Sequence, residues 1–163
     1  MINHEVTSVN LVLHPIGIVH NPIPSGKRDI RWETVDSQVV IEPAWADALD
    51  GIEGFSHIWV LFQLSQSAPP ESPCTHPQGR EDAPLVGRFA TRTPVRPNPI
   101  GMTAVELLAV EGNRLQVRGL DALDGTPVLD LKPYLPQGDS VPQARVPDWL
   151  TRLQANTATS NPS

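Results

Sequence analysis

The segment GRFATRTPVRPNPIGMT, residues 87–103, is the part of this chain around which the other segments are arranged. Its three prolines remove backbone donors and clash with preceding turns, so no helix forms across Arg96 and the proline run is not a central strand. Arg88, Arg92 and Arg96 recur every four residues, and in an extended chain such even spacings share one face. The segment therefore predicts a stiff, exposed loop, which either holds Arg96 and Asn98 ready for a ligand or is a connection with solvated arginines.

Short segments on both sides of this loop have the pattern of β-strands. The run SHIWVLFQL, residues 56–64, is the most apolar, and its length and aromatics favour a buried strand. His57 stands at its start, as a structural or a catalytic histidine. We expect further strands at 11–20, 37–41, 85–90, 102–110, 115–120 and 128–131, a turn at 111–114, and short helices at 43–49 and 146–153. The sequence thus predicts a mainly β fold: a single small β-barrel-like domain, or a strongly curved sheet, with one or two short helices and long loops.

The length of 163 residues suits one domain around one core. We expect a flexible N-terminus at residues 1–10, the barrel domain at 11–142, and a short helix followed by a disordered tail at 143–163. Residues 65–84 contain five prolines and little periodicity. A loop of this length predicts a lid or a binding loop.

Composition excludes several kinds of site. Cys74 is the only cysteine, so a disulfide framework within the chain is excluded and a reducing compartment is expected. The five histidines are scattered, and we expect no metal site. The sequence has no run of about eighteen apolar residues and no signal peptide, which predicts a cytoplasmic protein that does not cross a membrane. It also lacks the glycine-rich fingerprint of a Rossmann nucleotide fold and the Walker loop.

Charge is distributed unevenly along the chain. The formal net charge is -6, but residues 80–118 contain six arginines against four acidic side chains. The rest of the chain carries six basic and fourteen acidic residues. An anionic partner such as a nucleic acid would therefore meet the central segment, and a dimer would double that patch.

A second polar cluster, LDALDGTP at residues 120–127, contains two carboxylates. Asp121 and Asp124 can accept hydrogen bonds from a ribose or an ammonium group, and they can equally cap their own turn. Shortly downstream, Asp130 and Lys132 share one face of a predicted strand, where a solvated ion pair would have little energetic value.

Three segments together, GIEGFSHIWVLF at 51–62, the loop at 87–103 and the stretch at 120–136, resemble the TsaA-like, or TrmO, family. The most specific features are Arg-Pro-Asn-Pro-Ile-Gly, followed downstream by Asp-Gly-Thr-Pro and Lys-Pro-Tyr. The resemblance implies a small β-barrel that binds S-adenosyl-L-methionine without a Rossmann fold, usually as a homodimer. It implies an S-adenosylmethionine-dependent methyltransferase that transfers a methyl group to N6 of threonylcarbamoyl-adenosine next to the tRNA anticodon.

The resemblance also implies roles for individual residues. Cofactor-binding positions carry over to Ser65, Gln66, Arg92, Met102, Asp121, Ala122, Leu123 and Asp124. Asp124 and Tyr134 are the candidate catalytic residues, which would accept the proton of the attacking nitrogen or orient that nitrogen. Contacts to the RNA substrate are expected from Arg88, Arg96, Asn98 and Lys132.

Three departures from the family pattern are visible in the sequence. Ser65 stands where the family often has histidine. The early loop lacks a Pro-Arg-Gln triplet, for which Lys27, Arg28 and Arg31 are candidate substitutes, and the chain stops soon after the barrel, whereas some members add a C-terminal domain that helps hold tRNA. These departures leave two alternatives: a methyltransferase acting on another substrate, and a non-catalytic barrel that senses S-adenosylmethionine.

Overall fold

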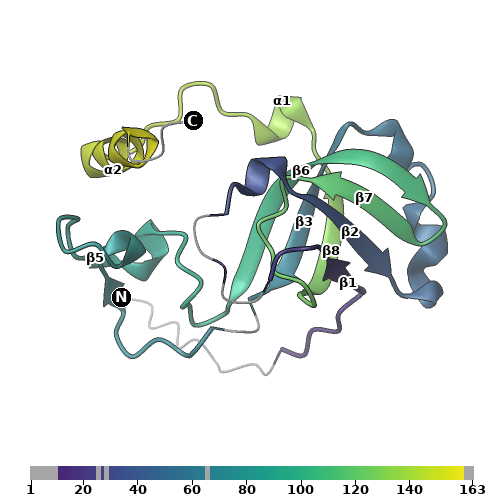
Figure 1. Ribbon diagram of the computed structural model, residues 1–163, viewed down its shortest axis with the longest axis horizontal. Helices are drawn as coiled ribbons and strands as arrows, with labels where there is room; N and C mark the ends of the chain where they lie inside the picture. Colours follow the sequence, from purple (N-terminus) through teal and green to yellow (C-terminus); the bar gives the residue numbers. More distant parts are fainter. Residues whose placement is uncertain (1–10, 25–26, 28–29, 65–66, 160–163) are drawn as a thin grey trace, which may run out of the picture.

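A computed structural model of the chain describes residues 11–24, 27, 30–64 and 67–159. Six strands form a closed barrel in which every recorded strand pair is antiparallel. Their order around the barrel is β1 (Gly17–His20), β2 (Asp36–Ile41), β7 (Arg114–Arg118), β6 (Ile100–Glu111), β3 (His57–Gln63) and β8 (Pro127–Pro133) (Figure 1). The predicted mainly β, barrel-like fold is confirmed.

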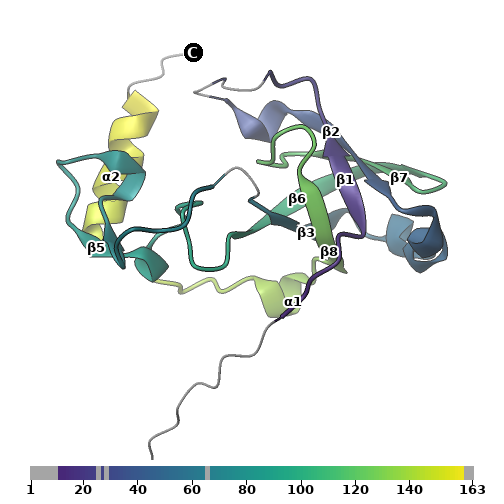
Figure 2. The same cartoon turned by 90° about the horizontal axis from the view of Figure 1, so that it is seen from below.

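The remaining elements are short and lie outside the barrel sheet. Two two-residue strands, β4 (Cys74–Thr75) and β5 (Val86–Gly87), pair with each other. The 3-10 helices are η1 (Trp32–Thr34), η2 (Pro43–Leu49), η3 (Ile52–Gly54), η4 (Pro77–Gly79) and η5 (Arg88–Ala90), and the α-helices are α1 (Pro136–Asp139) and α2 (Asp148–Thr159). Residues 74–94, called the lobe below, stand to one side of the barrel with α2 beside them, as both views of the chain show (Figures 1 and 2).

The barrel is filled by alternate residues of each strand, because successive side chains of a barrel strand point inward and outward in turn. On β3, Ile58, Val60 and Phe62 are buried, whereas the residues between them are half-buried. The predicted buried strand is therefore present and is fully buried on one face only. Gly101 of β6 pairs with Phe62, and a Cβ at this glycine would collide with the phenyl ring, so the closeness of β3 and β6 requires glycine here.

Several strands and helices begin or end at other residues than predicted. The first strand begins at Gly17 rather than at residue 11, because Pro15 has no N–H for the ladder and residues 11–15 are exposed. The strand expected at 85–90 is only two residues long, because η5 turns the chain at Arg88. The expected helix at 43–49 has these bounds but is a 3-10 helix, and the C-terminal helix continues beyond residue 153 to Thr159.

The predicted turn at 111–114 connects β6 to β7, with Glu111 paired to Arg114. Gly112 has a φ of 59°, whereas Asn113 is not among the residues with positive φ. Asn113 instead donates its side-chain amide to the carbonyl of Ile41, so it links this hairpin to the end of β2. Expectations for residues 1–10, Arg28, Ser65, Gln66 and 160–163 lie outside the described residues.

Candidate cofactor and RNA site

Most of the predicted cofactor-binding residues lie at one end of the barrel. β1, β3 and β7 end there, while β6 and β8 begin there, as the antiparallel registers of these strands require. The loop of residues 121–124 lies between β7 and β8 and therefore crosses this end. Met102 reaches the same end from the start of β6.

The 121–124 loop is fastened to the end of β1 by polar contacts. The Asp124 carboxylate lies 3.3 Å from Nδ1 of His20 and accepts a 3.2 Å hydrogen bond from the backbone N–H of Asn21. The side-chain amide of Asn21 donates to the carbonyl of Ala122 at 2.8 Å. Ala122 is buried and anchors the loop, while Asp121 and Asp124 remain exposed. His20 and Asn21 were missed in the sequence, where their only signal was a pair of polar residues ending a strand.

Asp121 is held by a residue of β6, on the side of the barrel end opposite β1. The hydroxyl of Thr103 donates to its carboxylate. Thr103 precedes the buried Val105 by two residues on β6, so both side chains face the barrel interior. Met102 points outward and is 51% exposed. Thr103, rather than Met102, is therefore the β6 residue in contact with the carboxylate pair.

In the proline loop, two of the predicted RNA-binding arginines brace the loop itself. Arg88 donates to the carbonyls of Ser72 and Val95, the latter at 3.1 Å. Arg96 donates to the carbonyl of Thr91 at 2.8 Å, and its guanidinium lies 5.6 Å from the ring centroid of Phe89. The prediction that the three arginines share one face of an extended chain is corrected, because η5 interrupts that chain. Contacts of Arg88, Arg96 and the exposed Asn98 with RNA stay a prediction.

Arg92 lies on the lobe, apart from the 121–124 loop. It is exposed and lines a cleft of about 980 Å³ between the lobe and α2, together with Phe89 and Trp149. Among the described residues, no hydrogen bond or ion pair is recorded for its guanidinium. The lining of this cleft includes no residue of the 121–124 loop. Within one subunit the predicted cofactor residues therefore fall into two groups.

Tyr134 and Lys132 lie at the opposite end of the barrel from Asp124. Lys132 lies near the end of β8, and Tyr134 directly follows that strand. The seven residues of β8 span roughly 20 Å at the usual strand rise. The Tyr134 ring packs against Trp59 with centroids 5.6 Å apart, and Lys132 forms a 2.7 Å ion pair with Asp130. One subunit therefore does not bring Asp124 and Tyr134, the two candidate catalytic residues, into one site.

His57, at the start of β3, lies near the same end as Tyr134. Its Nδ1 lies 3.0 Å from the hydroxyl of Ser56, and its ring is 6.3 Å from that of Tyr134. Across the described parts of the chain, no group of three histidine, cysteine or acidic side chains could hold a metal ion. Within the same residues, none of the helices is long and apolar enough to cross a bilayer.

Comparison with known proteins relates this fold to one family. Residues 21–140 match the family described as the tRNA-methyltransferase O N-terminal domain. The chain is 42% identical over 136 residues to an S-adenosyl-L-methionine-binding protein of Archaeoglobus fulgidus, covering 82% of this chain and 96% of that one. It is 45% identical over 104 residues to the Escherichia coli tRNA (adenine(37)-N6)-methyltransferase, covering 61% of this chain and 44% of the enzyme. A crystal structure of TrmO from Pseudomonas aeruginosa superposes with a TM-score of 0.70 at 34% identity, over 84% of this chain and 61% of that one.

The closed barrel and the 121–124 loop with its polar partners define the class: a small β-barrel protein with a polar site at one end of the barrel. The chain belongs to the tRNA-methyltransferase O family, which confirms the predicted resemblance. It spans less than two thirds of the crystallised TrmO and less than half of the E. coli enzyme. Helix α2 lies beyond residue 140, where the match to the family domain stops.

Proposed function

We propose that this protein is an S-adenosylmethionine-dependent methyltransferase that methylates N6 of threonylcarbamoyl-adenosine next to the tRNA anticodon. The observation that supports it most is the fixed carboxylate pair of the 121–124 loop, on a barrel of the family whose E. coli relative is named a tRNA (adenine(37)-N6)-methyltransferase. Since the substrate would be tRNA, we also propose a cytoplasmic location.

The residues at the barrel end suit the groups of S-adenosylmethionine. Asp121 and Asp124 are exposed acceptors, which fit ribose hydroxyls and an ammonium group. The exposed guanidinium of Arg92 fits a carboxylate, which it can bind in a bidentate manner. When bound, the cofactor supplies a methyl group activated by a positively charged sulfur, so the protein mainly has to position the two reactants.

Asp124 is the proposed proton acceptor or orienting group for the attacking nitrogen. It is exposed toward the barrel end, and His20 and the backbone of Asn21 fix its position from behind. Tyr134 lies at the other barrel end, so a role for it in the same site requires a second subunit.

A homodimer would unite the two groups of cofactor residues, and we propose this state. A second copy that laid its lobe across the barrel end of the first would bring Arg92 to Asp121 and Asp124. Arg92→Ala and Asp124→Ala should each abolish methyl transfer, whereas a mixture of the two variants should recover about a quarter of wild-type activity, because half of the dimers would hold one intact site. Mixed dimers that stay inactive would contradict a shared site.

The experiment that tests the proposed reaction supplies labelled S-adenosylmethionine and tRNA carrying threonylcarbamoyl-adenosine, with unmodified tRNA as the control. Label should enter only the modified tRNA. A second candidate function, a non-catalytic sensor, is favoured by the names of the archaeal relatives, which describe S-adenosyl-L-methionine-binding proteins. Tight cofactor binding without transfer to any RNA would support the sensor, and transfer to a small amine instead would support a different substrate.

A further inference from the structure

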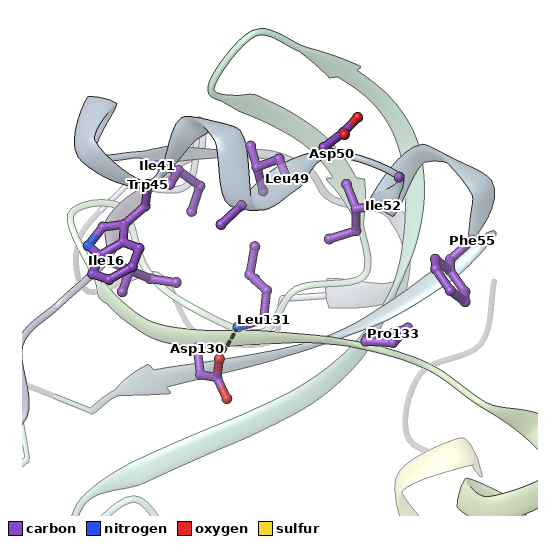
Figure 3. A pocket seen from close by; sticks show the side chains of 12 residues that line it. Ile16, Ile41, Trp45, Leu49, Asp50, Ile52, Phe55, Asp130, Leu131 and Pro133 are labelled. Atoms are coloured by element: carbon purple, nitrogen blue, oxygen red, sulfur yellow. Dashed lines mark hydrogen bonds between the residues drawn. The ribbon is translucent and has the colours of Figure 1, made fainter.

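A pocket lies at the barrel end far from the 121–124 loop. It has a volume of about 550 Å³ and lies between the η2–η3 segment and the second half of β8 (Figure 3). Its floor is apolar and continuous with the barrel core, and consists of Ile16, Ile41, Leu49, Ile52 and Leu131. This size and lining are typical of a site for a small organic molecule.

Two aromatic side chains stand at the mouth of this pocket. Trp45 and Phe55 are 53% and 37% exposed, so their rings are accessible to a ligand at the mouth. Figure 3 shows them on opposite sides of the apolar floor. Their ring faces carry negative electrostatic potential, which attracts cations.

The charged residues that line the pocket are both acidic. Asp130 already has partners, since it accepts a 2.9 Å hydrogen bond from the backbone N–H of Leu131 and pairs with Lys132 at 2.7 Å. Asp50 lies at the opposite edge, exposed, and no side-chain hydrogen bond or ion pair is recorded for it among the described residues. Of the residues that the structure describes, no lysine, arginine or histidine lines the pocket.

The surroundings add to this negative potential. Glu42, Asp47 and Glu53 belong to the same segment as Asp50, and the sequence has no lysine or arginine between Arg31 and Arg80. Lys132 pairs with Asp130 at 2.7 Å, which offsets its charge, whereas Arg114 donates to the neutral amide of Gln38 at 2.9 Å and keeps its positive charge. The acidic side chains of this segment disfavour a phosphate or carboxylate ligand in the pocket.

We propose that this pocket binds a small organic ammonium ion. The apolar body of the ligand would fill the floor, and its ammonium group would lie at the mouth beside Asp50. The ring faces of Trp45 and Phe55, on opposite sides of the floor, would add to the negative potential that attracts the cation. This site is separate from the proposed methyl-transfer site, because its lining contains none of the described residues assigned to cofactor or RNA. Binding can therefore be tested without any assay of methyl transfer.

The test compares three probes of similar shape and different charge: 2-phenylethylammonium, 2-phenylethanol and 3-phenylpropionate. Binding is followed by the indole N–H resonance of Trp45, assigned with Trp45→Phe. The ammonium should bind at least about tenfold tighter than the anion and shift the Trp45 signal. Equal affinity for the three probes, or no binding of the ammonium, would overturn the proposal.

Variants locate the site. Asp50→Asn should weaken ammonium binding about fivefold to tenfold, because it removes the open carboxylate. Asp47→Asn is the matched control: it removes an exposed charge from helix η2, which directly precedes Asp50, does not line the pocket and should change affinity less than about twofold. Ala48→Phe, an exposed position that lines the pocket, should block binding of the ammonium while the thermal unfolding curve stays cooperative. Unchanged affinity in Asp50→Asn and Ala48→Phe would contradict the assignment.

Discussion

The carboxylate of Asp124 lies 3.3 Å from Nδ1 of His20, across 104 positions of sequence. This contact and the hydrogen bond from the backbone of Asn21 join the 121–124 loop to the strand on the other side of the barrel end. Because one Asp124 oxygen faces these partners, the position of the carboxylate is set before any ligand binds. The site therefore depends on His20 although the histidine itself was assigned no role from the sequence.

Substitution at this contact should reduce cofactor affinity in two steps. Asp124→Asn should weaken S-adenosylmethionine binding about tenfold, because it removes the proposed charged acceptor, and His20→Ala about threefold, because it only loosens the loop. Titration calorimetry on the folded variants measures both. Glu111→Gln, an exposed acid at the far end of β6, is the control. Full affinity in folded Asp124→Asn would remove the loop from the cofactor site.

Arg96→Lys separates the bracing role of this arginine from a role of its charge. Lysine keeps the positive charge but cannot reproduce the planar guanidinium that reaches the Thr91 carbonyl and packs on Phe89. We expect a loss of about 1 kcal/mol in the free energy of unfolding, measured with urea. Arg145→Lys, at an exposed position between α1 and α2, should leave stability unchanged. Wild-type stability in Arg96→Lys would show that the brace contributes nothing.

Gly101→Ala should destabilise the barrel by about 1–3 kcal/mol, since the added Cβ meets the buried ring of Phe62 and forces β3 and β6 apart. The matched control is Gly87→Ala, where the new methyl group meets no atom within 4 Å and the backbone φ of -60° suits alanine. Urea unfolding of both variants measures the difference. Equal stability of the two would contradict the close approach of the strands.

The turn at α1 should loosen in acid. A backbone hydrogen bond from Leu135 and a side-chain hydrogen bond from Trp59 Nε1 lower the pKa of Asp139 below its usual range. A carboxyl whose pKa is lowered by folding contributes stability above its unfolded pKa, and that contribution is lost as the pH falls through the folded value.

The indole N–H resonance of Trp59 should therefore be constant above about pH 5 and shift only below the ordinary aspartate range near 3.9. Asp139→Asn should remove this titration. A Trp59 signal that titrates at or above the ordinary aspartate value would contradict the lowered pKa of Asp139.

Local patterns were sufficient to predict the barrel. A β-branched segment located β2, an apolar run with aromatic residues located β3, and alternation located β7, while β6 was expected beside the proline loop and Gly112 located the hairpin between β6 and β7. Those signals are local in sequence and reflect strand geometry directly. The position of β8 was predicted too, but its observed length of seven residues separates Asp124 from Tyr134 more than the four predicted residues did.

The site was less predictable because its contacts are distant in sequence or involve backbone carbonyls. His20 and Asn21 meet the 121–124 loop more than a hundred residues away, which no periodicity reveals. Arg88 and Arg96 appeared as free cations, yet their guanidinium groups bind carbonyls of the surrounding chain. Such side chain to backbone bonds depend on how the loop folds, not on residue spacing.

The proposed methylation of threonylcarbamoyl-adenosine is tested most directly by the mass of that nucleoside after reaction. Modified tRNA is incubated with S-adenosylmethionine and the protein, digested to nucleosides and analysed by fragmentation, with Asp124→Ala as the inactive control. We predict the mass gain of one methyl group, located on N6, with the wild-type protein alone. An unmethylated nucleoside in the presence of bound cofactor, or a methyl group at another atom, would contradict the proposed reaction.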